Sequence, residues 1–391
     1  MVYLVFPVDS FSGWGVCGKY LVKELSNYTD VKLVAENVIY ENILDELDYR
    51  LLIESQISKE EINYIKDSKL YNVNGVVLHA IAGNTLISVI PQLKGEKNFG
   101  YIFFEENILS KELIENGRRN FDLVIAGSKW NEALLRYYGL NNVETILQGI
   151  DPSVFNPYYS EKQYFKDKFV IFSGGKFEFR KGQDIVIKAF GYLQDKYKDV
   201  ILINSWYNLW PHSFQTMKMS KNIYFSIDNI CIDSVEDYIH TINKIISDNG
   251  IDISKVITLP LMPNIMMAKI YKNTDIGLFP NRCEGGSNLV MMEYMACGKP
   301  VIASYNSGHK DVLNEENSIL LSRMKPVIVK DDRDLNIAIW EEPDIDEVIE
   351  KLIWAYHNRE ELLKIGKKAG KDMSRLTWSE TAKRFYEIMI R

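Results

Sequence analysis

Cysteine is scarce in this sequence and never clustered. The 391 residues include Cys17, Cys231, Cys283 and Cys297, and no two of them form a CxxC pair. The sequence therefore excludes a disulfide-rich scaffold and disfavours a structural zinc site. Such sparse use of cysteine fits a reducing compartment.

Long apolar runs and surplus basic charge are missing as well. No stretch approaches the roughly 18 consecutive apolar residues of a membrane-spanning helix, and residues 1–9 lack the basic start and long apolar core of a signal peptide. With 46 Lys and Arg against 53 Asp and Glu, the formal net charge is −7, which argues against a dedicated nucleic-acid binder. We expect a cytoplasmic protein, with peripheral membrane attachment left open, and neither a nucleic-acid partner nor an integral membrane segment.

What the sequence does have is a repeated order of short apolar run, turn and amphipathic helix. Short, nearly continuous apolar runs are typical of strands buried on both faces of a parallel sheet. In the first half we predict strands at Val2–Val8, Gly75–His79, Phe99–Phe104 and Leu123–Ala126, and helices at Val16–Leu25 and Lys129–Tyr138. Ser128 is placed to cap the second of these helices, and Gly139 to end it.

The same order restarts after residue 168. We predict strands at Phe169–Ser173, Val200–Asn204, Val256–Leu259, Ile276–Phe279 and Pro300–Ala303, and helices at Gln183–Lys196, Val235–Ser247, Ile265–Tyr271 and Leu289–Cys297. Two βα series imply an α/β protein with two doubly wound, Rossmann-like domains. We place them at 1–157 and 165–375, joined by a linker that contains two prolines.

Three final helices have no strands between them. They are predicted at Ile345–His357, Glu361–Asp372 and Ser379–Ile390. The last of them, within residues 376–391, is predicted to pack back on the first domain. Residues 205–250 are less regular and are interpreted as an elaboration of the second domain.

The most informative segment runs from Glu284 to Pro300. It follows a strand and opens a helix, and its residues Gly285, Gly286, Ser287, Asn288 and Leu289 form the turn between them. The glycines allow a ligand close to the backbone, Ser287 or Asn288 can cap the helix, and its N-terminal N–H groups then suit a phosphate. Glu293, over one turn into the helix, is placed to accept hydrogen bonds from a ribose or sugar hydroxyl. The alternative is a purely structural role, in which the helix is capped and buried and Glu284 and Glu293 bind no ligand.

A second turn, from Ser173 to Asp184, gathers three cations. Lys176, Arg180 and Lys181 follow a glycine pair and precede a helix. Fixed cations at this place would stabilise the charge that develops on a departing diphosphate. A solvated basic loop is the alternative. The segment is not a P-loop, because GxxxxGK[ST] is absent.

A third glycine turn follows the first strand. Gly13, Gly15 and Gly18 form GxGxxG, but Glu36 is the one acid near the end of a second strand that could read a ribose. We therefore rank dinucleotide binding low and expect this loop to close over a ligand held by the other domain.

Together these loops resemble the GT-B-fold retaining glycosyltransferases of family 4, the glycosyl transferases of group 1. Residues 284–300 resemble the family's acidic motif and its MACG-P segment, and residues 176–182 its Arg-x4-Lys-Gly motif. Residues 121–128, 148–151 and 155–157 resemble its interdomain stretch. The resemblance covers most of the chain, and it implies two domains facing a cleft.

The resemblance also implies roles for individual residues. Glu284 would touch the donor sugar, Glu293 would bind the nucleotide ribose, and Lys176 and Lys181 would hold the diphosphate. Gly13 and Gly15 would form the loop near donor and acceptor. No cofactor is implied, only a nucleotide diphosphate sugar, UDP- or GDP-linked, as co-substrate, together with a glycan, protein or small-molecule acceptor.

The sequence departs from the family pattern at three places. Eight residues rather than seven separate Glu284 from Glu293, so the phosphate-facing turn is one residue longer than in the family pattern. Lys176 stands where arginine is usual, so the bidentate fork is lost while the charge is kept. Where many members carry an active-site histidine, this sequence has Phe103–Glu106, so Glu105 is a candidate for that place.

Further candidates were weighed against ordinary structural roles. His79, at the end of a predicted strand, and His309 could contact a ligand or be buried structural histidines, whereas His212 and His240 are interpreted as incidental. Asp344 and Asp346 form a DxD, which a helix N-cap explains without a metal. Trp206, Tyr207 and Trp210 either stack on a sugar or pack internally, with packing favoured.

These observations predict a metal-independent glycosyltransferase that moves a sugar to an acceptor hydroxyl, with retention implied by the resemblance. The predicted catalytic residues are Glu284, Glu105 and Lys181. The alternatives are a sugar-nucleotide epimerase of the same fold and a catalytically degenerate partner protein.

Overall fold

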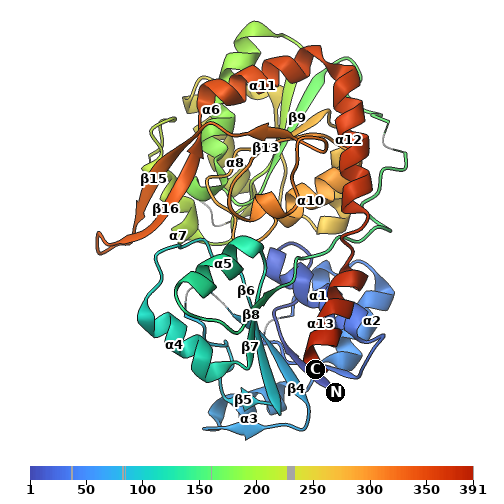
Figure 1. Cartoon of the computed structure of the whole chain (residues 1–391). Coiled ribbons are helices and arrows are strands. Elements are labelled where there is room, and N and C mark those ends of the chain that lie inside the picture. Colours follow the sequence, from blue (N-terminus) through green and yellow to red (C-terminus); the bar gives the residue numbers. More distant parts are fainter. Residues whose placement is uncertain (37, 82, 84, 160, 227–233, 391) are drawn as a thin grey trace.

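The computed structural model describes residues 1–390 except 37, 82, 84, 160 and 227–233, so Cys231 lies outside the described residues. Two six-stranded sheets organise it, one above the other in Figure 1, and all their strand pairs are parallel. The expected α/β class with two Rossmann-like units is confirmed.

The first sheet has the strand order β2-β1-β4-β6-β7-β8. Its strands are β1 (Val2–Val5), β2 (Val31–Leu33), β4 (Val76–Ile81), β6 (Lys97–Ile102), β7 (Leu123–Ala126) and β8 (Val143–Thr145), and its helices are α1 (Gly13–Leu25), α2 (Glu46–Ser55), α3 (Lys59–Asp67), α4 (Lys111–Asn120) and α5 (Lys129–Tyr137). A short parallel pair, β3 (Tyr71–Asn72) with β5 (Leu93–Lys94), lies beside it. Strands β7 and β4 are buried almost throughout, as their apolar sequences require.

The second sheet has the order β11-β10-β9-β12-β13-β14. Its strands are β9 (Phe169–Gly174), β10 (Val200–Ser205), β11 (Val256–Thr258), β12 (Ile276–Phe279), β13 (Val301–Ser304) and β14 (Ile319–Leu321), and the helices that follow them along the chain are α6 (Gln183–Lys196), α7 (Pro211–Gln215), α8 (Val235–Asp248), α9 (Met267–Lys272), α10 (Leu289–Ala296), α11 (Ile345–His357) and α12 (Arg359–Met373). Ser128 and Asn288 cap α5 and α10 through their side chains. Among the described residues, no helix is long and apolar enough to cross a membrane.

The last helix, α13 (Trp378–Met389), returns to the first sheet, as expected (Figure 1). Trp378 and Phe385 are buried in the core of that half of the molecule, and the Trp378 ring stacks on Tyr20 of α1 with 5.3 Å between ring centroids. The chain therefore passes twice between the two halves.

Several elements were not predicted from the sequence, among them a β-hairpin. Strands β15 (Met324–Lys330) and β16 (Asn336–Pro343) form an antiparallel hairpin that extends from the second half toward the first (Figure 1). Ile328 of β15 and Leu335, in the turn between the two strands, are both 54% exposed. Within its strands Val329, Ala338 and Pro343 are buried, too few to give the pattern that marks a buried strand.

Candidate functional site

The loops that follow the strands of the two sheets meet each other. The Ser128 hydroxyl, at the start of α5, donates to the Gly285 carbonyl oxygen at 2.6 Å, and the Lys129 amide donates to Asp311 at 2.8 Å. A Cβ atom on Gly285 would lie 2.6 Å from the Phe104 backbone. The glycine at 285 is therefore required for the close approach of the two halves as well as for any ligand.

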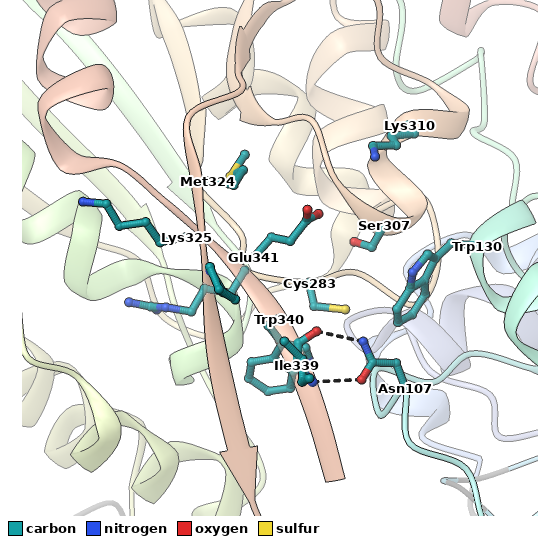
Figure 2. Close-up of a pocket in the computed structure, with 12 residues that line it drawn as sticks. Asn107, Trp130, Cys283, Ser307, Lys310, Met324, Lys325, Ile339, Trp340 and Glu341 are labelled. Atoms are coloured by element: carbon teal, nitrogen blue, oxygen red, sulfur yellow. Dashed lines mark hydrogen bonds between the residues drawn. The ribbon is translucent and has the colours of Figure 1, made fainter. Parts of the chain in front are cut away.

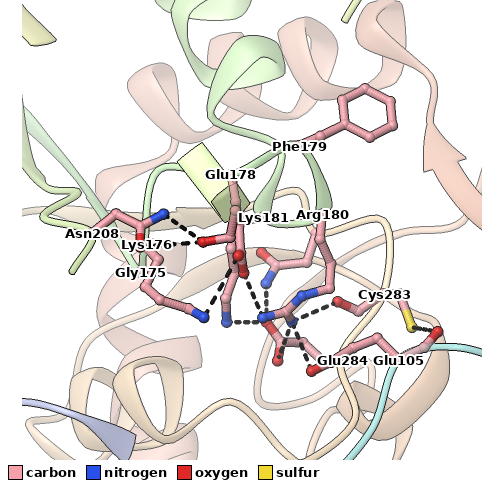
Figure 3. Close-up of polar contacts among 12 residues, drawn as sticks. Glu105, Gly175, Lys176, Glu178, Phe179, Arg180, Lys181, Asn208, Cys283 and Glu284 are labelled. Atoms are coloured by element: carbon pink, nitrogen blue, oxygen red, sulfur yellow. Dashed lines mark hydrogen bonds and ion pairs between the residues drawn. The ribbon is translucent and has the colours of Figure 1, made fainter. Parts of the chain in front are cut away.

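A cluster of three cations and three carboxylates lies at this junction. Figure 3 shows Lys181 and Arg180 directed at Glu284, with Arg180 Nη1 3.1 Å from Glu284 Oε2. Arg180 also pairs with Glu178 at 2.6 Å and with Glu105 at 3.3 Å. The structure thus brings together the three predicted catalytic residues, Glu284, Glu105 and Lys181. Lys181 and Glu284 meet because β9 and β12 are neighbours, so that the loops that follow them share one edge of the second sheet. Glu105 reaches the cluster from the loop after β6 of the first sheet.

Electrostatics hold this cluster in its ionised form. Burial alone would raise the pKa of Glu284, but Lys181 and Arg180 outweigh it and lower that pKa to about 2. Burial likewise would raise the pKa of Glu178, and Arg180 and Lys176 lower it instead. Burial lowers the pKa of Lys181, against the opposing effect of Glu284.

Lys176 occupies the outer part of the cluster. Its ammonium lies 3.5 Å from a Glu178 oxygen and 4.6 Å from the centre of the Trp210 ring, and its side chain is 36% exposed. Trp210 is therefore a partner of a predicted binding residue, whereas Trp206 is fully buried and its indole N–H donates to Ser173. Packing, the favoured interpretation, holds for Trp206.

The turn before α10 is built around Asn288. This residue has a positive φ of 65°, and its side-chain oxygen accepts from the Met291 amide. The side-chain N–H₂ of Asn288 lies 3.1 Å from His309 Nε2, while His309 Nδ1 lies 2.9 Å from the Ser304 carbonyl. Burial lowers the pKa of His309 to about 4. A neutral His309 that donates from Nδ1 and accepts at Nε2 satisfies both contacts, so His309 positions the helix cap.

Other predicted residues of this turn lie deeper. The Ser287 hydroxyl is buried and contacts the Met292 sulfur at 2.9 Å, while Leu289 packs against the hydrophobic cores of both halves. A Cβ on Gly286 would lie 2.9 Å from the Phe103 ring. The turn is consequently closed by the first half of the chain.

Glu293 is buried one turn into α10, apart from the charged cluster. Burial raises its pKa to about 8, against the hydrogen bond from the Asn264 side chain, which is 3.0 Å away. The Asn264 amide in turn donates to the Ser10 carbonyl at 2.6 Å. A neutral carboxyl at this place links α10 to the loop after β1.

In the loop after β1, close packing leaves no room for a side chain at two of the glycines. A Cβ on Gly15 would lie 2.1 Å from the Asp9 carboxylate, and one on Gly18 would lie 2.1 Å from the Pro7 carbonyl. Gly13 has nothing within 4 Å of such a Cβ, and its carbonyl accepts from Gln148 at 3.4 Å. Of the GxGxxG residues, Gly13 alone has open space beside it.

His79 stands apart from the other predicted site residues. It is fully buried in β4, its Nδ1 lies 2.7 Å from the Ser88 hydroxyl, and its ring packs against Phe121. Burial lowers its pKa to about 3. The structural interpretation of this histidine therefore fits the contacts better than the ligand role. Glu36 pairs with Lys66 at 3.0 Å, and Asp344 caps α11, as expected.

Three residues at the junction were not singled out from the sequence. Glu178 pairs with Arg180, Asn264 holds Glu293, and Gln148 lies between Gly13 and the Gly286 turn. Gln148 comes from an irregular segment and Asn264 from the start of a three-residue 3₁₀ helix, Asn264–Met266. Neither segment has enough regular structure for a periodic pattern to mark a functional side chain. Glu178 stands between two of the predicted cations, which is the one sequence signal that it will be paired.

This architecture is the GT-B fold. Sucrose-phosphate synthase from Thermosynechococcus elongatus superposes with a TM-score of 0.65 at 14% identity, covering 99% of this chain and 97% of the other. HepE from Anabaena, solved with UDP-glucose, gives 0.65 at 14% identity over 99% of both chains. A trehalose-6-phosphate synthase, studied with bisubstrate glycomimetics for glycosyltransfer with retention, gives 0.64 at 13% identity, over 99% of this chain and 98% of the other. At these identities the likeness establishes the fold.

The sequence itself matches a family model described as Glycosyl transferases group 1 over residues 240–333. The match contains Glu284, the glycine turn and Glu293, so the expected resemblance is confirmed for the segment that carries the acidic motif. No curated protein sequence matches the chain.

Proposed function

We propose that this protein is a glycosyltransferase that moves a sugar from a nucleotide diphosphate sugar to an acceptor hydroxyl. The observation that carries the proposal is the buried cluster of Lys181, Arg180 and Glu284. Glu284 and the helix that follows it, α10, lie inside the matched segment. The family match and the GT-B neighbours, among them HepE with its UDP-glucose, support the same class.

In this proposal Lys181, Arg180 and Lys176 bind the diphosphate, together with the N–H groups at the start of α10. Charge on the leaving diphosphate grows as its bond to the sugar carbon breaks, and preorganised cations in a water-poor site stabilise that charge. Glu284, released from Lys181 by the diphosphate, becomes available to the sugar hydroxyls. Glu293 accepts hydrogen bonds from the ribose.

Retention and independence from metal ions belong to the same proposal. The leaving diphosphate oxygen takes the proton of the incoming hydroxyl on the face from which it departs, which preserves the anomeric configuration. Glu105, 3.3 Å from Arg180, lies where its carboxylate can orient the acceptor hydroxyl. Three side-chain cations supply the positive charge that a metal would otherwise provide.

A thermal-shift screen against UDP, GDP, ADP, CMP and their common sugar conjugates tests the donor site. A ligand at 100 times its dissociation constant adds about 2.7 kcal/mol of stability. We expect a shift with one diphosphate, unchanged by EDTA and lost in Lys181→Ala. Lys188→Ala, an exposed lysine on α6, is the matched control and should keep the shift.

The stereochemistry and the reaction class come from the identified donor. Proton NMR of the product formed with a panel of hydroxyl acceptors should give the donor's anomeric configuration. Conversion of the donor alone into another nucleotide sugar would favour the epimerase. No shift with any nucleotide at millimolar concentration would contradict a transferase and favour the degenerate partner protein.

A further inference from the structure

A pocket of about 530 Å³ lies beside the charged cluster, between the hairpin and the first half of the chain (Figure 2). It is bordered by Trp130 of α5, by Ser307 and Lys310 of the segment after β13, and by Trp340 and Glu341 of β16. Its volume falls within the roughly 300–1,000 Å³ of small-molecule sites. Of these residues, Ser307 contacts the proposed donor site, because its hydroxyl accepts from the Glu284 backbone amide at 2.8 Å.

The pocket exists because the hairpin docks on the loop after β6. The Asn107 side chain donates to the Ile339 carbonyl at 2.7 Å and accepts from the Ile339 amide at 2.8 Å. The Ile108 amide donates to Ile337 at 3.1 Å, and the Trp340 indole N–H donates to the Glu105 carbonyl at 2.8 Å. Four hydrogen bonds thus hold one wall of the pocket against residues of the other half.

A single layer of residues separates the pocket from the charged cluster. Glu105 directs its carboxylate at Arg180 on one side and its carbonyl at Trp340 on the other. Cys283 borders the pocket, and its carbonyl accepts from Arg180 Nη1 at 3.1 Å. The pocket therefore adjoins the proposed reacting centre, on the side of Glu105 rather than that of Glu293.

The lining suits a sugar ring. In Figure 2 the Glu341 carboxylate and the Ser307 hydroxyl point toward the same space, and the Trp130 ring lies across it from the hairpin. Glu341 and Lys310 are both exposed. A carboxylate accepts from sugar hydroxyls, an ammonium donates to sugar oxygens, and an indole face covers apolar C–H groups.

From this placement we propose that the pocket is an acceptor subsite, binding a sugar unit of a glycan acceptor one or more units away from the reacting hydroxyl. The inference rests on the proposed function and narrows its acceptor class to oligosaccharides or glycosides rather than simple alcohols. In this proposal the subsite forms where the hairpin docks on the loop after β6. The Glu105 carboxylate, in the same loop, faces the reacting hydroxyl of the acceptor.

Saturation-transfer NMR with free glucose, galactose, mannose, N-acetylglucosamine and glucuronate tests the subsite directly, since a single ring is expected to bind in the millimolar range. At least one sugar should show saturation transfer with the wild-type protein. The signal should fall at least fivefold in Trp130→Ala and be restored in Trp130→Phe, which keeps a flat ring. Trp354→Ala, another surface tryptophan (39% exposed) on α11, is the matched control and should leave it unchanged.

Two further variants guard against a folding effect of the tryptophan change. Lys310→Gln and Glu341→Gln alter exposed side chains, and each should weaken the sugar signal, whereas Lys367→Gln on α12 should not. Sugar signals that are absent from the wild-type protein, or equal in Trp130→Ala, would overturn the subsite.

The nucleotide thermal shift, measured on the same preparations, separates the two proposals. A shift that persists in Trp130→Ala while the sugar signal is lost supports both. A shift without any sugar signal overturns the subsite and leaves the transferase intact. If no nucleotide shifts the wild-type protein, the transferase fails, and the acceptor role of the pocket fails with it.

Discussion

At the residue scale, Glu284 binds the cations that a diphosphate would also bind. Lys181 and Arg180 pair with its carboxylate, and the Asn281 side chain donates to it as well. Lys176, Arg180 and Lys181 are balanced here by Glu105, Glu178 and Glu284. A diphosphate must therefore displace at least one carboxylate, which couples donor binding to the release of Glu284.

Glu284→Gln should separate binding from chemistry. Leaving two buried cations with fewer partners should cost about 3 kcal/mol of stability. UDP should bind about tenfold more tightly, because it no longer competes with the Glu284 carboxylate for the cations. A tenfold change in affinity corresponds to the free energy of about one charge-assisted hydrogen bond. Transfer activity should fall by about two orders of magnitude or more. Urea unfolding, UDP titration calorimetry and donor turnover measure the three effects.

Glu105→Gln is the control for this variant. Glu105 faces the same Arg180, but its side chain is 31% exposed, so it should change stability much less. Weaker UDP binding in Glu284→Gln would show that Glu284 does not compete for the cations.

Glu293 should make stability depend on pH in the opposite sense to Glu284. Its pKa is raised by burial from 4.5 to about 8, so the folded protein keeps a proton that the unfolded chain releases. Stability should fall with rising pH by about 1.4 kcal/mol per unit between roughly pH 5 and 8, and this loss is complete above the folded pKa. Lys19 and Asp151, the other charges acting on Glu293, oppose each other.

Glu293→Gln, which carries no proton to lose, measures this contribution. Its free energy of unfolding, relative to the wild-type protein, should rise by about 2.7 kcal/mol from pH 5 to pH 7. Parallel pH profiles for the two proteins would mean that Glu293 is ionised in the folded state.

At the scale of elements, the hairpin β15–β16 joins the two halves through the Asn107 side chain. Asn107 pairs with both backbone groups of Ile339, as a neighbouring strand would. Arg282 connects the hairpin to the second half of the chain. It pairs with Glu342 of β16 at 2.7 Å and with Asp184 of α6 at 2.6 Å. The residue next to Arg282 is Cys283, and Glu284 follows, so hairpin and cluster are mechanically connected.

Asn107→Ala should release the hairpin without unfolding the protein. Losing the two bonds should cost about 1 kcal/mol and speed amide exchange about fivefold in residues 336–343. Hydrogen–deuterium exchange measures this, with Asn336→Ala, at the start of β16, as the control. Unchanged exchange at Ile339 would show that other contacts hold the hairpin in place.

Two strands were predicted from the sequence with their exact bounds, and both are buried along their whole length. Leu123–Ala126 and Ile276–Phe279 are short, continuous apolar runs. In an α/β protein such a run forms a strand that is covered on both faces, so its bounds can be read from the sequence. The short edge strands β2 and β8 and the half-exposed hairpin were missed, since their stability comes from neighbours far along the chain.

The same reasoning explains which site residues could be predicted. Lys181 and Glu284 follow adjacent strands of one sheet, so strand assignment alone brings them together. Gln148 reaches Gly13 only through the packing of segments far apart in the sequence, and Asn264 reaches Glu293 from the segment before α9; no local pattern encodes either contact. His79 was predicted to end its strand, but β4 continues to Ile81, and the His79 side chain contacts Ser88 and Phe121 rather than the junction.

At the scale of the whole molecule, the two chain passages between the halves lie against each other. The Ile150 amide donates to Leu376 at 2.8 Å, and the Trp378 amide donates to Ile150 at 3.2 Å. A Cβ on Gly149 would lie 2.3 Å from the Trp378 nitrogen, so glycine alone permits this crossing. Because α13 begins at Trp378, the crossing fixes the last helix and the linker together.

Gly149→Ala should therefore weaken the molecule at the crossing rather than in either core. Pushing two backbones apart costs about 1–3 kcal/mol, and each kcal/mol lowers Tm by roughly 2–4 °C for domains of this size. Scanning calorimetry should show the lower transition, and exchange should rise at the amides of Ile150 and Trp378. Gly191→Ala in α6, whose Cβ meets only the end of the Ile251 side chain at 3.1 Å, should be neutral or stabilising. If Gly149→Ala melts with the wild-type protein, the two passages have room to separate, and they do not set the relative position of the two halves.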